Sequence, residues 1–230
     1  DLYHNIRGLN HKGHITIGVT SQFGLRMLTE IIPAYKKVFP QVTIEITESN
    51  VPTLTRMILE EGIDCAVMAL NCADAFAEEQ VSLLRKEEVL FAVPAAHGYC
   101  LRNRTGIMTR EELIHEFKDE NFMLSKKGST LRELADRIFA SAGFQPSTMC
   151  ETNSIIATRA MVAKGIGVTF IARSCVSDRE NVAYYSLNPR MYRYNALVRR
   201  KNLIQNEPER ALFQHIRGYF ERQDEDGPAD

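Results

Sequence analysis

The first 70 residues alternate between two hydrophobic periods, and this alternation constrains the fold more than any other feature. HITIGV (14–19) and VTIEITE (42–48) place apolar side chains at every second position, which is typical of strands. Residues 23–39 and 52–61 repeat apolar residues at helical spacing, and IDCAVMAL (63–70) is apolar enough for a strand buried on both faces. This order of strands and helices predicts an α/β fold, a parallel sheet covered by helices.

The rest of the chain repeats the pattern with new material, which predicts a second α/β unit. Strands are expected at 89–94, 121–125, 166–171, 182–187 and 191–198, and an amphipathic helix at 211–220. The spacing of Thr109 with Glu112, and of Thr130 with Glu133, matches the capping box, so a helix should start near each pair.

Single residues in this second half predict further helix ends. Asn153 is a favourable N-cap for the helix that follows it. Gly143 and Gly165 are expected to end helices, and Gly167 is expected to allow close packing.

Charge and composition argue against several classes of function. Lys and Arg number 28 against 29 Asp and Glu, so the net charge of −1 does not suit a chain that grips a phosphate backbone. No apolar stretch approaches the roughly 18–20 residues that span a bilayer, so we expect no membrane partner. Five cysteines without a CxxC pair indicate free thiols in a reducing, cytoplasmic setting, with a redox or metal role as the lesser alternative.

Motifs that would mark an enzyme are missing from the sequence. The glycines of GIGVTF (165–170) lie between a helix and a strand, the reverse of the order in a dinucleotide-binding turn. The histidines do not form HExxH, and no serine lies in a GxSxG elbow. We therefore expect no enzyme, no catalytic residue, no metal and no cofactor.

Four polar loops each join the end of a predicted strand to the start of a predicted helix: TSQFG (20–24), ESNVPT (48–53), SKKGST (125–130) and ETNS (151–154). Helix N-termini carry free N–H groups and partial positive charge, so converging N-termini form a site for an anionic or polar ligand. The alternative is that each Ser, Thr or Asn only caps its own helix. Two loops come from each predicted unit, which favours the ligand site.

Seven segments, in their order along the chain, resemble the effector-binding domain of the LysR-type transcriptional regulators over about residues 12–222. These segments are GHITIGVTSQ, PAYKKVFPQVTIEITESN, LTRMILEEGIDCAV, VLFAVPAAHG, KGSTLRELADRIFASAGF, ETNSIIATRAMVAKGIGVTFIAR and YNALVRRKN. The resemblance implies a two-lobed fold like the type 2 periplasmic binding proteins, with two Rossmann-like subdomains joined by two crossover strands near 91–94 and 197–200.

The resemblance also implies a division of the chain. Subdomain I would comprise residues 13–93 and 199–223, and subdomain II residues 94–198. Residues 1–12 resemble the remnant of a linker, and residues 224–230 are expected to form a disordered tail. Family members contact DNA through an N-terminal winged helix-turn-helix, and we expect none within these 230 residues.

Matching the family's ligand loops residue by residue gives an effector site in the cleft between the lobes, without a catalytic or metal role. The implied residues are Ser21, Gln22, Asn50, Val51, Lys126, Lys127, Gly128, Ser129, Thr130, Asn153 and Thr169. Val51 stands where the family usually has Ser or Thr, so the ligand loses a hydroxyl donor there. Thr130 stands where the peroxide-sensing branch has its reactive cysteine, which argues against that redox mechanism.

The resemblance thus implies a cytoplasmic sensor of a small anionic or polar effector, forming a homodimer or tetramer and touching DNA only through the helix-turn-helix domain. A solute-binding protein of a transporter, which shares the two-lobed fold, is the alternative. The sequence upstream of this chain distinguishes them, since the regulator requires a basic, helix-rich segment there.

Overall fold

The computed structural model describes residues 13–20 and 22–225, with side chains as far as residue 222. The chain forms two compact units, unit 1 from Asp1–Arg85 with Tyr194–Asp230 and unit 2 from Lys86–Arg193. The chain passes from one unit to the other within two long strands, β4 (Val81–Pro94) and β9 (Val182–Arg199). This division falls earlier in each strand than the boundaries at 93 and 198 drawn from the sequence. Because the chain changes units inside continuous strands, no loop in the sequence marks the boundary between the units.

Both predicted ends of the chain lie largely outside the described residues. The linker remnant at 1–12 and positions 226–230 of the predicted tail are not described. Helix α8 (Glu207–Glu225) extends two residues into the segment predicted as tail.

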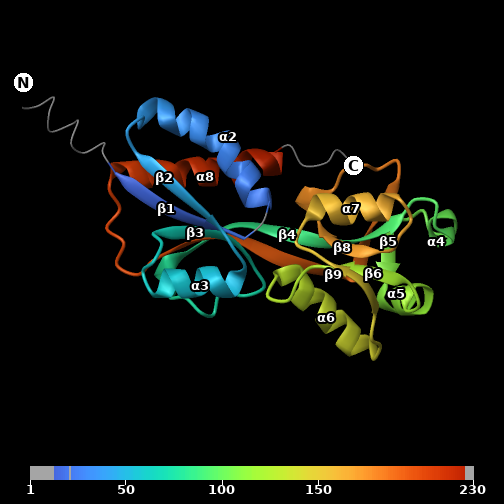
Figure 1. The fold of residues 1–230 in the computed structure, drawn as a ribbon. Helices are drawn as coiled ribbons and strands as arrows, with labels where there is room; N and C mark the ends of the chain where they lie inside the picture. The colour runs from blue at the N-terminus through green and yellow to red at the C-terminus, as the bar shows by residue number, and fades with distance from the viewer. Residues whose placement is uncertain (1–12, 21, 226–230) are drawn as a thin grey trace, which may run out of the picture. The chain divides into compact units, whose positions relative to one another are not determined.

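Unit 1 contains a four-stranded stretch of sheet in the order β2–β1–β3–β9. Strand β1 (His14–Val19) is parallel to β2 (Thr43–Glu48) and to β3 (Cys65–Leu70), as the alternating pattern predicts. Strand β9 closes this stretch antiparallel to β3, with Arg199 opposite Cys65. The helices are α2 (Gln22–Val38), α3 (Val51–Leu59) and α8 (Figure 1), with a short 3₁₀ helix η1 (Glu78–Gln80) before β4.

Helices cover both faces of this sheet because its central strands are apolar on both sides. In β3, Cys65 and Val67 pack in one core with α2 and α8, whereas Ala66, Met68 and Leu70 pack in another with α3. Such continuous burial is typical of the parallel sheets of α/β domains. The helices that start at the carboxyl ends of β1 and β2 are therefore fixed by these two cores.

Unit 2 is built around β4 and β9. Strand β4 pairs antiparallel with β8 (Thr169–Ala172), and β5 (Ile107–Thr109) pairs parallel with β9. Strands β6 (Asn121–Leu124) and β7 (Ser147–Glu151) form a second, parallel pair. The helices are α4 (Gly98–Arg102), α5 (Arg110–Phe117), α6 (Thr130–Ala142) and α7 (Ile155–Ala163), with the 3₁₀ helix η2 (Arg173–Cys175) after β8.

Helices also cover two faces of the sheet in unit 2. Helices α5 and α6 share one core with β4 through Phe117, Phe139 and Phe91. Helix α7 contributes Val162 to a second core, which contains Leu90 from the opposite face of β4. The parallel pair β6–β7 lies against this body through a bridge from Phe122 to Val168.

The sequence located most helix ends correctly but misplaced two caps. Thr109 and Glu112 form the expected capping box, with distances of 3.1 Å and 2.7 Å between the side chains and the amides they bind. Helix α6 begins at Thr130, but its cap is Ser129, whose hydroxyl accepts from the Arg132 amide at 3.2 Å. Asn153 was expected to cap α7, and this is wrong, because Ser154 caps it.

Candidate ligand-binding site

The predicted site residues of unit 1 lie where two parallel strands end together. Strands β1 and β2 run in register to Val19 and Glu48, so the turns that follow them leave the same edge of the sheet. Gln22 is the first residue of α2, and Ser21, also predicted to bind ligand, lies outside the described residues. This edge therefore carries the N-termini of α2 and α3.

The start of α3 is fixed by its cap. The Asn50 side-chain oxygen accepts from the Thr53 amide at 2.9 Å, and Val51 and Pro52 form the first turn. Proline suits this position because the missing N–H would have no partner inside the helix. Asn50 thus caps its own helix, as the alternative to a ligand site predicted. Val51 presents an apolar side chain beside it.

In unit 2 one hydrogen bond joins two predicted loops. The Lys126 amide, just after β6, donates to the side-chain oxygen of Asn153, just after β7, at 3.0 Å. Beside it, the Thr152 amide donates to the Leu124 carbonyl at 3.0 Å. Ser154 caps the following helix by accepting from the Ala157 amide at 3.3 Å. Asn153 therefore does not cap a helix but holds the loop before α6 against the loop before α7.

The loop before α6 presents positive charge and a left-handed turn. Lys126 and Lys127 are exposed, and Gly128 has φ 85°, a conformation that residues with a Cβ rarely adopt. Ser129 caps α6 directly after this turn. The partial positive charge at the N-terminus of α6 and the two ammonium groups both favour a negatively charged ligand.

An ion pair that the sequence did not reveal lies beside this loop. The Arg132 guanidinium donates to the Glu151 carboxylate at 2.5 Å and to the Ser125 carbonyl at 3.1 Å, so it ties α6 to the end of β7. The hydrogen bond and charge of Arg132 hold the pKa of Glu151 below its ordinary value, and Lys127 lowers it further. The partners are 19 residues apart, and no local spacing marks them as neighbours.

Two of the predicted residues are largely enclosed in unit 2. Thr169 is 3% exposed, and its hydroxyl donates to the Met123 carbonyl of β6 at 2.6 Å. Thr130 is 6% exposed at the first position of α6. The Thr169 hydroxyl is therefore used to join β8 to β6, and we expect the exposed loop residues to offer the ligand contacts.

The predicted residues thus form one set in each unit. The first set is Gln22, Asn50 and Val51 at the sheet edge of unit 1, and the second is Lys126, Lys127, Gly128, Ser129, Thr130 and Asn153 around the start of α6. The described part of the chain holds no group of three or more His, Cys, Asp or Glu side chains placed to bind a metal ion. No described helix is long and apolar enough to cross a membrane.

Known proteins resemble this chain over most of its length. A family model described as the LysR substrate binding domain matches residues 10–221. The transcriptional dual regulator GltC of Bacillus subtilis (strain 168) is 24% identical over 170 residues, which cover 73% of this chain and 53% of the relative. The chain therefore spans about half the length of this curated relative.

Solved structures share the fold. The BenM effector binding domain with its effector benzoate has a TM-score of 0.67 at 21% identity, over 92% of this chain and 94% of that one. The effector binding domain of QuiR in complex with shikimate has a TM-score of 0.69 at 20% identity, over 92% and 98%. The fold is the type 2 periplasmic-binding-protein-like α/β fold that the family resemblance implied.

Proposed function

Because the chain belongs to the family of LysR substrate-binding domains, we propose that it is the ligand-sensing domain of a LysR-type transcriptional regulator. Its effector is a small anionic or polar molecule. Ligand binding alters the DNA-binding state of a full-length dimer or tetramer, whose DNA contacts come from a separate helix-turn-helix domain. The related proteins named above are regulators and effector-binding domains, and this supports a sensor over an enzyme.

The observation that carries this proposal is the hydrogen bond from the Lys126 amide to Asn153. This bond joins the loop before α6 to the loop before α7, which gives the polar surface a defined shape. Exposed Lys126 and Lys127 border it, and Ser129 caps α6 beside them. Helix N-termini bind carboxylates and phosphates through their free amides, so a negatively charged effector suits this loop.

Unit 1 contributes a different chemistry to the proposed site. Asn50 supplies a polar side chain, and Val51 beside it supplies an apolar one. Neither residue carries a positive charge. An effector with one anionic end and one apolar part matches the chemistry of the two loop sets, and benzoate and shikimate are reasonable first probes because the similar domains named above bind them.

The proposed mechanism is differential binding. A ligand shifts an equilibrium between two arrangements of a protein only by the difference in its affinity for them. Coupling free energies of about 1–3 kcal/mol are typical of such regulation. The proposed effector therefore need not alter the fold of either unit to alter the DNA-binding state of the oligomer.

The decisive experiment is calorimetric screening of benzoate, shikimate and other small carboxylates, followed by charge variants. Lys127→Ser should weaken binding of the identified carboxylate about two- to five-fold, the usual scale of one exposed charge interaction. Lys118→Ser removes another exposed lysine, at the end of α5, and it should leave the affinity unchanged. Equal effects of the two substitutions, or a screen without any binder, would contradict the proposed site.

The oligomeric part of the proposal has its own test. Sedimentation equilibrium of the chain at several concentrations should give a mass of two or four copies. A monomer at all concentrations would contradict this part, while leaving ligand binding to be judged by calorimetry.

A further inference from the structure

A separate hollow lies in unit 1, at the opposite edge of the sheet from the unit 1 effector loops: Arg199 pairs with Cys65 at the start of β3, whereas those loops follow the ends of the parallel strands β1 and β2. Its volume is about 250 Å³, and it is lined by Glu79, Gln80, Arg199, Arg200, Lys201, Asn202 and Leu203. These residues come from η1, which precedes β4, and from the turn that follows β9. The hollow thus lies at the unit 1 ends of the two strands through which the chain passes into unit 2.

Hydrogen bonds hold its walls in place. The Gln80 side-chain amide donates to the Arg199 carbonyl at 2.9 Å, and its oxygen accepts from the Ala77 amide at 3.2 Å. The Arg199 guanidinium donates in turn to the Glu79 carbonyl at 2.5 Å. Gln80 is 6% exposed, so this wall is a fixed part of unit 1.

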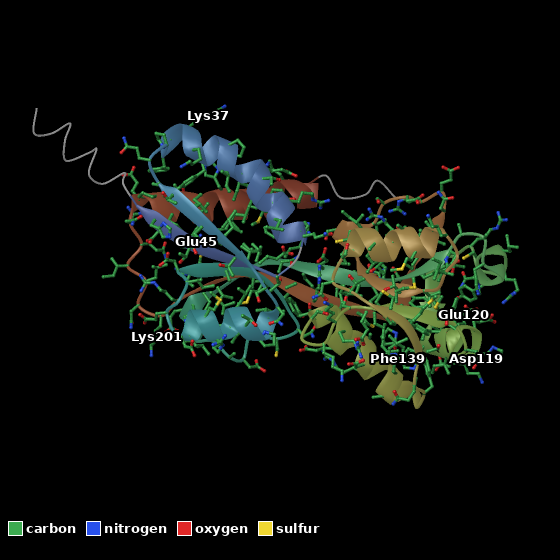
Figure 2. All side chains as sticks on the ribbon, in the orientation of Figure 1. Lys37, Glu45, Asp119, Glu120, Phe139 and Lys201 are labelled. Carbon is green, nitrogen blue, oxygen red and sulfur yellow. The ribbon has the colours of Figure 1, made fainter. Side chains whose placement is uncertain are left out.

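The cationic groups of the hollow differ in how far their charge is already balanced. Arg200 lies 3.1 Å from the Asp64 carboxylate and 3.8 Å from that of Glu61, so its charge is offset. Lys201, labelled in Figure 2, is exposed. Unlike Arg200, it forms no ion pair with another described residue. The Nε–H of Arg199 is buried, and it donates a hydrogen bond to no described side chain or carbonyl.

The backbone of the turn adds further donors. Asn202 has φ 61°, so the chain reverses direction in the left-handed region there. The amides of Lys201 and Asn202 donate to no backbone acceptor in the described part of the chain, whereas the Leu203 amide closes the hydrogen-bonded turn over residues 200–203. Unpaired amides in a turn that contains a left-handed residue are a common anion-binding arrangement.

We propose that this hollow binds a phosphate group, free or carried by a small metabolite, as a second ligand site distinct from the effector loops. Pockets for drug-sized ligands usually measure about 300–1,000 Å³, so a hollow of about 250 Å³ suits a smaller anion. Lys201 and the turn amides hold the phosphate oxygens, and Arg199 adds positive charge behind them. Glu79 is the one carboxylate in the lining and opposes binding.

Titration of the intact chain, followed by ¹H–¹⁵N NMR, tests the proposal. Inorganic phosphate and glycerol 3-phosphate are added separately at constant ionic strength, with chloride as the reference anion. The amides of Lys201, Asn202 and Leu203 should shift and saturate. Saturation by both compounds indicates a site for the phosphate group itself, whereas saturation by the ester alone indicates a phosphorylated metabolite. Shifts that stay linear, or that chloride reproduces, would overturn the proposal.

Three variants sharpen the test. Lys201→Ser should weaken phosphate binding about two- to five-fold, as expected for one exposed charge. Lys37→Ser removes an exposed lysine of α2, labelled elsewhere on unit 1 in Figure 2, and should change nothing. Glu79→Gln should tighten binding, because it removes the opposing carboxylate. If Lys201→Ser and Lys37→Ser weaken phosphate binding equally, phosphate is attracted only by the net charge of the protein, and the proposal is overturned.

The two ligand sites can fail independently. Lys201→Ser should leave affinity for the carboxylate effector unchanged, and Lys127→Ser should leave the phosphate-induced shifts unchanged. Loss of effector binding in the Lys201 variant would mean that the hollow is not a separate site.

Discussion

The Arg193 guanidinium of β9 lies 2.9 Å from the Glu87 carboxylate of β4, and the two side chains are only 5% and 2% exposed. The other Glu87 oxygen accepts from the Ser174 amide at 3.1 Å, so both oxygens are bonded. Glu87 and Arg193 lie in unit 2, close to the positions where the chain enters and leaves it. The ion pair therefore fixes β4 against β9 at this end of unit 2.

Breaking this pair should be costly. Arg193→Met leaves a buried carboxylate without its cation, which should lower the free energy of unfolding by about 3–5 kcal/mol. The double variant Glu87→Leu with Arg193→Met leaves no buried charge of the pair behind, so it should be less destabilised than Arg193→Met alone. Urea denaturation measures both effects. Arg190→Met is the control, because exposed Arg190 lies 3.7 Å from Glu88 and should contribute at most about 1 kcal/mol.

The Glu87–Arg193 pair also marks a limit of what the sequence predicts. Hydrophobic period reports on contacts within a helix or strand, and it located β1, β2 and β3 correctly. It was wrong on β9, which is one continuous strand where two were predicted at 182–187 and 191–198, and on β4, which starts at Val81 and not at residue 89. It carries no information on which charged residues meet across 106 positions of chain. The same limit concealed Glu151 as the partner of Arg132, although both residues border the predicted site.

Close packing at Gly167 was predicted and has a direct test. A Cβ at Gly167 would lie 2.2 Å from the Asn121 carbonyl oxygen, which belongs to the backbone of β6. Gly167→Ala must therefore push apart the segments that carry the Phe122–Val168 bridge, and we expect a cost of about 1–3 kcal/mol. Chemical denaturation measures this loss.

Gly218 provides the opposite case within the same chain. A Cβ there meets only the end of the flexible Arg222 side chain, at 3.4 Å, inside helix α8. Gly218→Ala should therefore stabilise the protein by about 0.5–1 kcal/mol, because alanine favours the helix. Destabilisation by both substitutions to the same extent would contradict the packing argument.

The pKa of Glu151 depends on Arg132. Arg132 lowers this pKa from its ordinary value of 4.5, so the stability gained from the pair is present above that value and is lost as the pH falls through the folded-state pKa. Arg132→Met should raise the pKa toward its ordinary value, and Lys127→Ser should raise it by a smaller amount. Carbon-detected NMR titration of the Glu151 carboxyl measures each shift. Equal shifts in the two variants would show that the direct hydrogen bond is not the main cause.

Helix caps illustrate why neighbouring polar residues limit prediction. Thr109 has no competing cap beside it, and its capping box forms as expected. Asn153 and Ser154 are adjacent, and both are good N-caps, so sequence alone cannot choose between them. The choice depends on the Lys126 amide, 27 positions away, which takes the Asn153 side chain. Asn153 therefore makes the tertiary contact between the two loops, although its place in the sequence is typical of a helix cap.

This role of Asn153 leads to a prediction that distinguishes a residue that joins the two loops from a residue that caps α7. Asn153→Ala removes the acceptor of the Lys126 amide but leaves Ser154 to cap α7. Hydrogen exchange at the Lys126 amide should accelerate about five-fold, the equivalent of a hydrogen bond worth about 1 kcal/mol. Affinity for the carboxylate effector should fall as well, because the loop before α6 loses its fixed position.

Ser154→Ala is the matched control, since it removes the cap next door and spares the bond between the loops. Exchange should then accelerate at Ala157, whose amide donates to the Ser154 hydroxyl oxygen, and not at Lys126. Stability should fall by about 1 kcal/mol, as for other lost N-caps. If Asn153→Ala accelerates exchange at Ala157 instead, Asn153 acts as a cap after all. If it accelerates exchange at Lys126 without weakening effector binding, the joined loops do not form the ligand site.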